Sequence, residues 1–142
     1  MKHFLLLLIM STTLILSCSK DDDNSSSINP GNVTNTVTSG TWRITYYWDT
    51  DHEETSDFSG YSFTFGSNGV LTATKTGSTV TGSWSTGTDD SKTELIIVFA
   101  SPDSFVEISD DWEVIEMTDT RIKLLDVSGG NGGTDQLIFE KN

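Results

Sequence analysis

The sequence is poor in cysteine, histidine and basic residues, and each scarcity excludes a class of function. The single cysteine, Cys18, has no partner in the chain for a disulfide, and two histidines leave little material for a Cys/His metal site. Only 8 lysines and arginines oppose 21 aspartates and glutamates, which gives a net charge of −13. A chain this acidic lacks the basic face that phosphate binding needs, so we expect no nucleic-acid partner and no direct adhesion to anionic lipid.

Long apolar segments are also scarce, and the one near the start is too short to cross a bilayer. It occupies residues 4–16 and follows Lys2, whereas a helical span takes roughly 20 apolar residues. A short, positively charged start followed by such a run is typical of a secretory signal peptide. We therefore predict a cleaved signal peptide over residues 1–17.

The apolar run ends in Ile15-Leu16-Ser17-Cys18, which resembles the lipobox of bacterial lipoproteins. The resemblance implies cleavage by signal peptidase II before Cys18, a diacylglycerol on its thiol and an acylated amine. Several acyl chains anchor durably, because each buried methylene contributes about 0.8 kcal/mol and one chain alone binds only marginally. The partner implied is the membrane. The alternative is a plain secretory signal with an incidental cysteine.

Residues 18–39 are predicted to be the lipidated cysteine and a flexible tether. They are rich in Ser, Asn, Thr and Asp, and three apolar residues, Ile28, Val33 and Val37, are too few to repay the entropy of ordering. The segment Ser19 to Asp23 resembles the acidic export tags of surface lipoproteins in one large group of Gram-negative bacteria. That resemblance implies a lipid-anchored, surface-exposed location at the outer membrane. The alternative is a solvated linker.

Residues 40–142 are predicted to form one all-β domain. Alternating apolar and polar residues, rich in β-branched and aromatic types, are interrupted by Gly, Asn, Asp and Ser, and helical spacing is weak. Ser67-Asn68-Gly69 predicts a hairpin turn and 128–134 a glycine-rich loop. About eight antiparallel strands joined by hairpins favour an up-and-down barrel, with a β-sandwich as the alternative. The predicted strands are 41–49, 60–66, 70–74, 80–85, 93–99, 111–117, 121–126 and 136–140.

Alternation in the first strand also predicts which side chains face the core. The residues predicted to face inward are Trp42, Ile44, Tyr46 and Trp48, and those predicted to face outward are Arg43, Thr45 and Tyr47.

The sequence Gly40-Thr41-Trp42 looks like the Gly-x-Trp motif of lipocalins. Three later segments, 61–69, 81–84 and 112–114, complete a resemblance to the small lipocalin-like domains of bacterial outer-membrane lipoproteins. The resemblance implies a barrel that Trp42 plugs at its closed end, while the open mouth admits a small hydrophobic ligand. The residues expected to line that pocket are Tyr46, Trp48, Tyr61, Phe63, Trp84, Phe99 and Trp112. The alternative function is a non-catalytic structural or interaction module, whose filled barrel contacts a surface protein or a glycan.

The densest polar cluster is the segment Asp49 to Asp57. Asp49, Asp51 and Glu53 have the one-three-five spacing of a calcium loop, but the glycine and the final glutamate of such a loop are missing. A solvated hairpin loop is the main interpretation, and calcium binding stays open.

No catalytic pattern is evident. His52 is the sole histidine after the signal peptide, the Gly-x-Ser-x-Gly elbow is missing, and 129–133 lacks the Lys-Ser or Lys-Thr of a phosphate loop. We expect no enzyme activity, no cofactor and no metal site.

Overall fold

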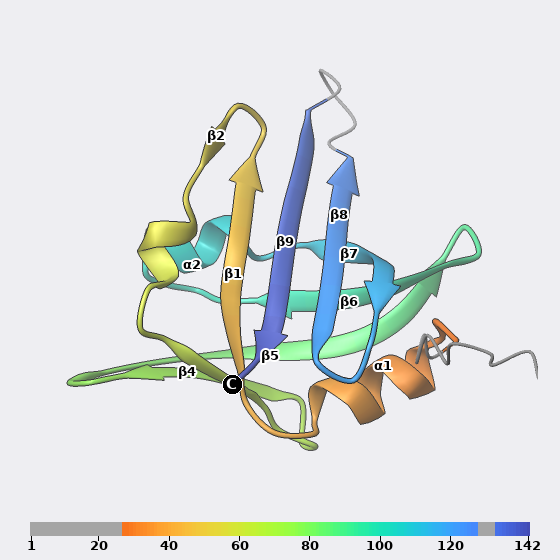
Figure 1. The fold of residues 1–142 in the computed structure, drawn as a ribbon, viewed down its shortest axis with the longest axis horizontal. Coiled ribbons are helices and arrows are strands. Elements are labelled where there is room, and N and C mark those ends of the chain that lie inside the picture. The colour runs from red at the N-terminus through yellow and green to blue at the C-terminus, as the bar shows by residue number, and fades with distance from the viewer. Residues whose placement is uncertain (1–26, 128–132) are drawn as a thin grey trace, which may run out of the picture.

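A computed structural model describes residues 27–127 and 133–142, which form an all-β barrel (Figure 1). The predicted signal peptide, Cys18, the export tag and most of the loop 128–134 lie outside the described residues. The sheet has nine strands in the order β2-β1-β3-β4-β5-β6-β7-β8-β9, and β9 also pairs with β1. Because chain neighbours are sheet neighbours and the last strand pairs with the first, the antiparallel sheet closes into an up-and-down barrel. The predicted barrel is confirmed, and the β-sandwich is not adopted.

Each predicted strand is present, with ends that differ by a few residues at most. β2 (His52–Glu53) is a short extra strand beside the end of β1. Three helical segments were not predicted: α1 (Pro30–Val37), the 3-10 helix η1 (Thr55–Phe58) and α2 (Asp103–Glu107). The strands that close the barrel are β1 (Trp42–Asp49), β3 (Ser62–Phe65), β4 (Val70–Lys75), β5 (Ser78–Asp89), β6 (Lys92–Val98), β7 (Asp111–Met117), β8 (Arg121–Val127) and β9 (Thr134–Lys141).

A β-bulge in β1 changes which side chains face the interior. The register with β9 runs from Trp42 opposite Lys141 to Trp48 opposite Gln136, and it shifts between Ile44 and Tyr46. One extra residue in a strand reverses the alternation beyond it. Trp42 and Ile44 therefore point inward as predicted. The predicted inward placement of Tyr46 and Trp48 is wrong, because Tyr47 is the residue buried beyond the bulge.

Helix α1 lies within the stretch that was predicted to be tether, and that prediction is wrong here. The Asn29 side chain caps the helix by accepting the Asn32 N–H at 3.0 Å, and Pro30 takes the first position, where it costs no hydrogen bond. Val33 and Val37, one turn apart, are fully buried and belong to the core. Burying these two side chains against the barrel offsets the ordering entropy. The folded domain therefore begins near Asn29 instead of Gly40.

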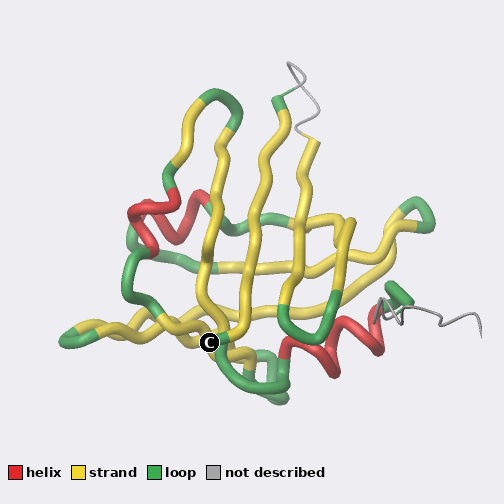
Figure 2. Tube along the Cα trace, in the orientation of Figure 1, coloured by secondary structure: helices red, strands yellow, loops and turns green. Residues whose placement is uncertain are grey.

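Helical segments cover the barrel on two sides, as Figure 1 and the secondary-structure colouring of Figure 2 show: α1 at the lower right, and η1 with α2 at the upper left. On the α1 side, Trp42 is fully buried and its indole N–H donates to the Val37 carbonyl at 2.8 Å. On the other side, η1 contributes Phe58 and α2 contributes Phe105, whose ring centroids are 5.4 Å apart. Both sides of the core are thus covered by side chains of the same chain.

A glycine in β5 shows how tightly the interior is packed. Gly82 lies between the inward-facing residues Val80 and Trp84. A Cβ at Gly82 would lie 2.3 Å from the Val98 carbonyl oxygen and 2.5 Å from Cδ1 of Phe99. The Phe99 ring therefore takes the space that a side chain at this position would need.

Candidate functional site

The structure places five of the seven predicted ligand-lining residues inside the barrel. These are Tyr61, Phe63, Trp84, Phe99 and Trp112, and each is buried within one continuous core. The other two, Tyr46 and Trp48, are half-buried on the outer face. The seven residues expected to line one pocket therefore lie on opposite sides of the barrel wall and do not line a single pocket together.

The inward-facing aromatic residues contact one another. The Phe63 ring centroid lies 6.0 Å from that of Phe105 and 5.4 Å from that of Phe139, and Phe105 lies 5.0 Å from both Tyr61 and Phe99. Ring centroids at 4.5 to 7 Å, many of them edge to face, are the favourable packing geometry of aromatic side chains. The rings that were expected to surround a ligand thus pack against one another inside the barrel.

The polar atoms of the buried aromatic side chains are also satisfied by the protein. The Trp112 indole N–H donates to the Ile108 carbonyl at 3.0 Å, and the Trp84 indole N–H donates to the Gly66 carbonyl at 2.9 Å. The Tyr47 hydroxyl donates to the Glu107 carbonyl at 3.1 Å. Burial, followed by the nearby carboxylates, raises the pKa of Tyr47, which keeps this donor protonated. These groups already have partners without a ligand.

The segment Asp49 to Asp57 forms the β1–β2 hairpin and η1, as the hairpin interpretation predicts. His52 is exposed, and its ring nitrogens lie 2.5 Å from an Asp51 oxygen and 2.7 Å from a Glu54 oxygen. These two hydrogen bonds raise the pKa of His52. In the described residues, the carboxylate oxygens of Asp49, Asp51 and Glu53 do not lie close enough to one another to bind a single cation. The structure therefore does not support the calcium hypothesis.

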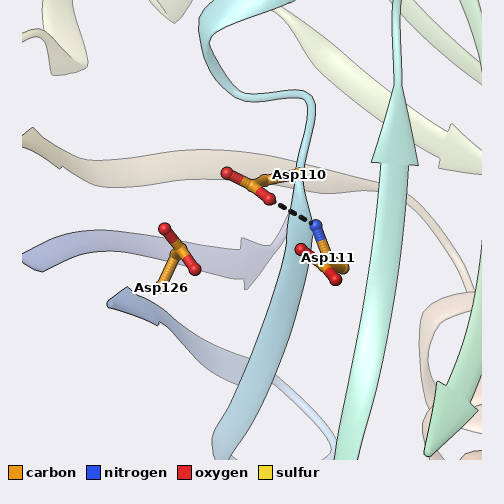
Figure 3. Close-up of side chains that lie close together, drawn as sticks. All are labelled: Asp110, Asp111 and Asp126. Carbon is orange, nitrogen blue, oxygen red and sulfur yellow. Dashed lines mark hydrogen bonds between the residues drawn. The ribbon is translucent and has the colours of Figure 1, made fainter. Parts of the chain in front are cut away.

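A second acidic group was missed in the sequence. Asp110 and Asp111, at the start of β7, and Asp126, near the end of β8, bring carboxylate oxygens within 4.8 Å of one another (Figure 3). The Asp111 N–H donates to Asp110 at 2.8 Å. Burial, and then the adjacent carboxylates, raise the pKa of Asp110 to about 6. A proton on Asp110 relieves the repulsion within the group in mildly acidic solution.

The outer face of β1, β9 and β8 holds a shallow groove made of two adjoining hollows. The hollows measure about 410 and 290 Å³ and share Tyr46 and Gln136. We call them together the outer-face groove. The larger hollow is also lined by Arg121, Lys123 and Ile138, and the smaller by Trp48 and Thr134.

Strand pairing explains why these side chains lie together. Ile138 of β9 is paired with Tyr46 on one side and with Lys123 on the other. Ile138 is only 8 % exposed, yet it is not part of the core cluster. Its neighbours in β9 point into the barrel, so Ile138 itself lies on the outer face. Trp48 is paired with Gln136 one row further along. The bulge in β1 therefore adds two aromatic side chains to a polar outer face.

This face differs in charge from the rest of the chain. Glu140 accepts a hydrogen bond from Arg43 at 3.3 Å and lies 3.8 Å from Arg121, which also pairs with Glu116. In the part of the chain that the structure describes, no carboxylate lies within ion-pair distance of Lys123. Three cations and two anions thus gather here, whereas the whole chain carries −13.

Periodicity alone could not find the outer-face groove, because a bulge leaves no fixed mark in a sequence. One signal was nevertheless present. Tyr46-Tyr47-Trp48 is an unbroken aromatic run, and in a strand at least one of three consecutive side chains points away from the core. The run itself therefore predicts an aromatic residue on the outer face.

Comparisons with known proteins give little further guidance. No protein-family model and no curated protein matches the chain. A solved structure of a DUF4847 family protein from Bacteroides vulgatus ATCC 8482 is similar at 15 % identity, with a TM-score of 0.49, and covers 78 % of this chain and 97 % of that chain. Within the described residues, the helices are all too short or too polar to span a membrane.

Proposed function

We propose that this protein is a lipid-anchored, non-catalytic binding module of the bacterial outer membrane, and that its barrel binds partners on its outer surface. The observation that carries the proposal is the aromatic packing of the interior, in which Phe63, Phe105 and Phe139 are fully buried and the Phe63 ring contacts the other two. Eight strands enclose a space just wide enough for side chains or one small ligand. Here the side chains take that space, which favours the interaction module over a carrier of apolar molecules.

The anchor rests on the lipobox-like Ile15-Leu16-Ser17-Cys18 segment. Helix α1 is capped by Asn29, so roughly 10 residues separate Cys18 from the first described helix, and a chain of this length reaches at most about 35 Å. The barrel would then lie close to the membrane surface, with its acidic character keeping it soluble and apart from anionic lipid. The acidic tag after Cys18 supports placement on the outside of the cell.

The non-catalytic part of the proposal rests on the surroundings of the reactive groups. Both ring nitrogens of His52 are engaged by the carboxylates of Asp51 and Glu54, so the ring is not aimed at a hydroxyl nucleophile. Asp110 has a pKa in the range useful for acid-base chemistry, but it belongs to a group of like charges on the surface. Neither arrangement supplies a nucleophile together with its base.

Lipid anchoring is tested with Cys18→Ala in the full chain expressed in a Gram-negative bacterium. We expect the parent protein to partition into the detergent phase and the variant to remain unprocessed or become soluble. A Ser17→Ala variant is the matched control, because it keeps a small residue before the cysteine. Equal partitioning and equal mass of Cys18→Ala and the parent would contradict the anchor.

The filled interior is tested by titrating the purified full chain in detergent with long-chain fatty acids, sterols and isoprenoids while recording tryptophan fluorescence. Trp84 and Trp112 are buried in the core, so a ligand that entered would change their emission. We expect the same small, non-saturating change that detergent alone produces. A saturable change whose midpoint falls with chain length would contradict the proposal and restore the apolar-ligand function.

A further inference from the structure

The outer-face groove combines two aromatic side chains with groups that both donate and accept hydrogen bonds. Tyr46 and Trp48 lie two residues apart on one face of β1, which separates them by about 7 Å along the strand. Gln136 lies opposite Trp48 on the neighbouring strand β9 and lines both hollows, and its amide offers two donors and an acceptor. Thr134 adds a hydroxyl at one end and Lys123 adds an ammonium group toward the other.

This combination restricts the chemistry of an occupant. A purely apolar molecule would cover the polar atoms of Gln136 and Lys123 without pairing them, which costs free energy. Arg121 already pairs with Glu140 and Glu116, so among the described residues that line the groove Lys123 is the one cation without a carboxylate at ion-pair distance, and a polyanion would also meet a chain of net charge −13 around it. A second copy of the protein would bring the same excess of negative charge to the contact.

A sugar chain meets these conditions. A pyranose ring has one apolar face of C–H groups, which an aromatic ring attracts through its negative π-face, and a rim of hydroxyls. Each hydroxyl both donates and accepts, as Gln136 and Thr134 do. We infer that the outer-face groove binds a neutral oligosaccharide chain, with Tyr46 and Trp48 as stacking platforms and Gln136 as the main hydrogen-bonding residue. This inference rests on the proposed function, for which it names the partner and the surface.

The test is isothermal titration of the full chain, purified in detergent, with cellohexaose, maltohexaose, xylohexaose and mannohexaose. A heparin hexasaccharide of the same length serves as the anionic comparison. We expect saturable binding of at least one neutral chain. Trp48→Ala and Gln136→Ala should each weaken it by about tenfold, the loss expected when a central contact is removed.

Two variants serve as controls for the sugar titrations. Gln136→Ala leaves both aromatic residues in place, so weaker binding in a variant with an unchanged thermal midpoint reports the groove and not the fold. The double variant Val98→Ala/Val106→Ala removes exposed apolar surface elsewhere, since these side chains are 51 % and 44 % exposed. Binding by this control should equal that of the parent.

Several results would overturn the inference. They are flat titrations with all four neutral chains, binding confined to the heparin fragment, and neutral binding that Trp48→Ala and Gln136→Ala leave unchanged. A dimer in sedimentation velocity that Trp48→Ala dissolves would assign the face to a second copy. If the sugars fail while Cys18→Ala still releases the protein and apolar ligands still do not bind, the inference alone is wrong and the proposed function stands.

Discussion

The two tryptophans of β1 lie on opposite sides of the barrel wall. Trp42 is fully buried and donates its indole N–H to the protein's own backbone. Trp48 is half-buried on the outer face and lines the outer-face groove. They are an even number of positions apart, so an unbroken strand would put them on the same side, and the bulge between Ile44 and Tyr46 separates them. The end of β1 that carries Trp42 thus packs into the core, and the end that carries Trp48 lines the outer surface.

The same contrast extends to the two faces of the barrel as a whole. Inside, aromatic rings fill the space and their polar atoms have backbone partners. Outside, along β1, β9 and β8, aromatic residues lie beside an amide, a hydroxyl and charged groups of both signs. We therefore expect substitutions on the inner face to change stability and substitutions on the outer face to change the proposed binding, and the changes that follow should separate these two roles.

The largest effect is expected for Trp42→Ala. Removing a fully buried tryptophan leaves a large cavity, and we expect the free energy of unfolding to fall by about 3 to 5 kcal/mol. Against about 5 to 15 kcal/mol for a whole domain this is a large share. Urea denaturation measures it, and a midpoint equal to that of the parent would refute the inward placement of Trp42.

The packing of the interior is also tested by adding a side chain to the core instead of removing one. Gly82→Ala would place a Cβ against the Val98 carbonyl oxygen and the Phe99 ring, and we expect a loss of about 3 kcal/mol from overpacking. Gly87→Ala in the same strand is the matched control, since its nearest neighbour would be Ile96 Cδ1 at 3.6 Å. If the two variants were equally stable in thermal denaturation, there would be space for a side chain beside Gly82. That result would contradict a filled barrel.

Val33→Ala should cost about 2 kcal/mol, because this side chain of α1 is fully buried in the core. Asn35→Ala on the exposed side of the same helix should change stability by less than about 0.5 kcal/mol. Chemical denaturation of both variants decides whether α1 belongs to the core or to the tether. Two identical curves would restore the tether interpretation.

A smaller and pH-dependent effect is expected at Asp110. Its folded pKa of about 6 lies above its usual 3.8, so the folded protein holds this proton more tightly than the unfolded chain does. The contribution of Asp110 to stability therefore falls as pH rises from about 4 to 6. Asp110→Asn has no proton to lose and should be more stable than the parent at pH 7 by on the order of 1 kcal/mol, after allowance for solvent screening. At pH 4 the difference should nearly vanish, and a difference independent of pH would contradict the raised pKa.

A small effect on stability is expected for Trp48→Ala, the counterpart of Trp42→Ala. Because Trp48 is half-buried on the outer face, its removal should cost less than about 1 kcal/mol. Denaturation measured side by side for the two variants gives the contrast directly. Losses of similar size would mean that both tryptophans face the core, as unbroken alternation predicts.

Most of the fold could be predicted because strands with one buried face alternate in sequence. Tyr61, Phe63 and Phe65 are an example, since they alternate with Ser62 and Thr64 in the sequence and all three are buried. The helix α1 was missed because two valines in a polar segment look too few to fold, and the barrel that covers them is remote in sequence. Its Asn29-Pro30 start was the available signal.

The candidate site was harder to predict for two physical reasons. A bulge inverts the facing of every later residue in the strand, so one unrecognised irregularity misplaced Tyr46 and Trp48 together. The outer-face groove also depends on Gln136 of β9, which pairs with β1 only when the barrel closes, and on Lys123 of β8, which pairs with the other side of β9. Whether an interior is filled depends on packed volumes, which residue types alone do not give.

Xenon binding would report whether the barrel interior is full. Xenon enters dry apolar cavities in proteins, so crystals of the protein pressurised with the gas report such space. We expect no xenon among Phe63, Phe105 and Phe139, which are fully buried, with the Phe63 ring in contact with the other two. A xenon atom bound between these rings would contradict a filled interior and would reopen the interior as the binding site.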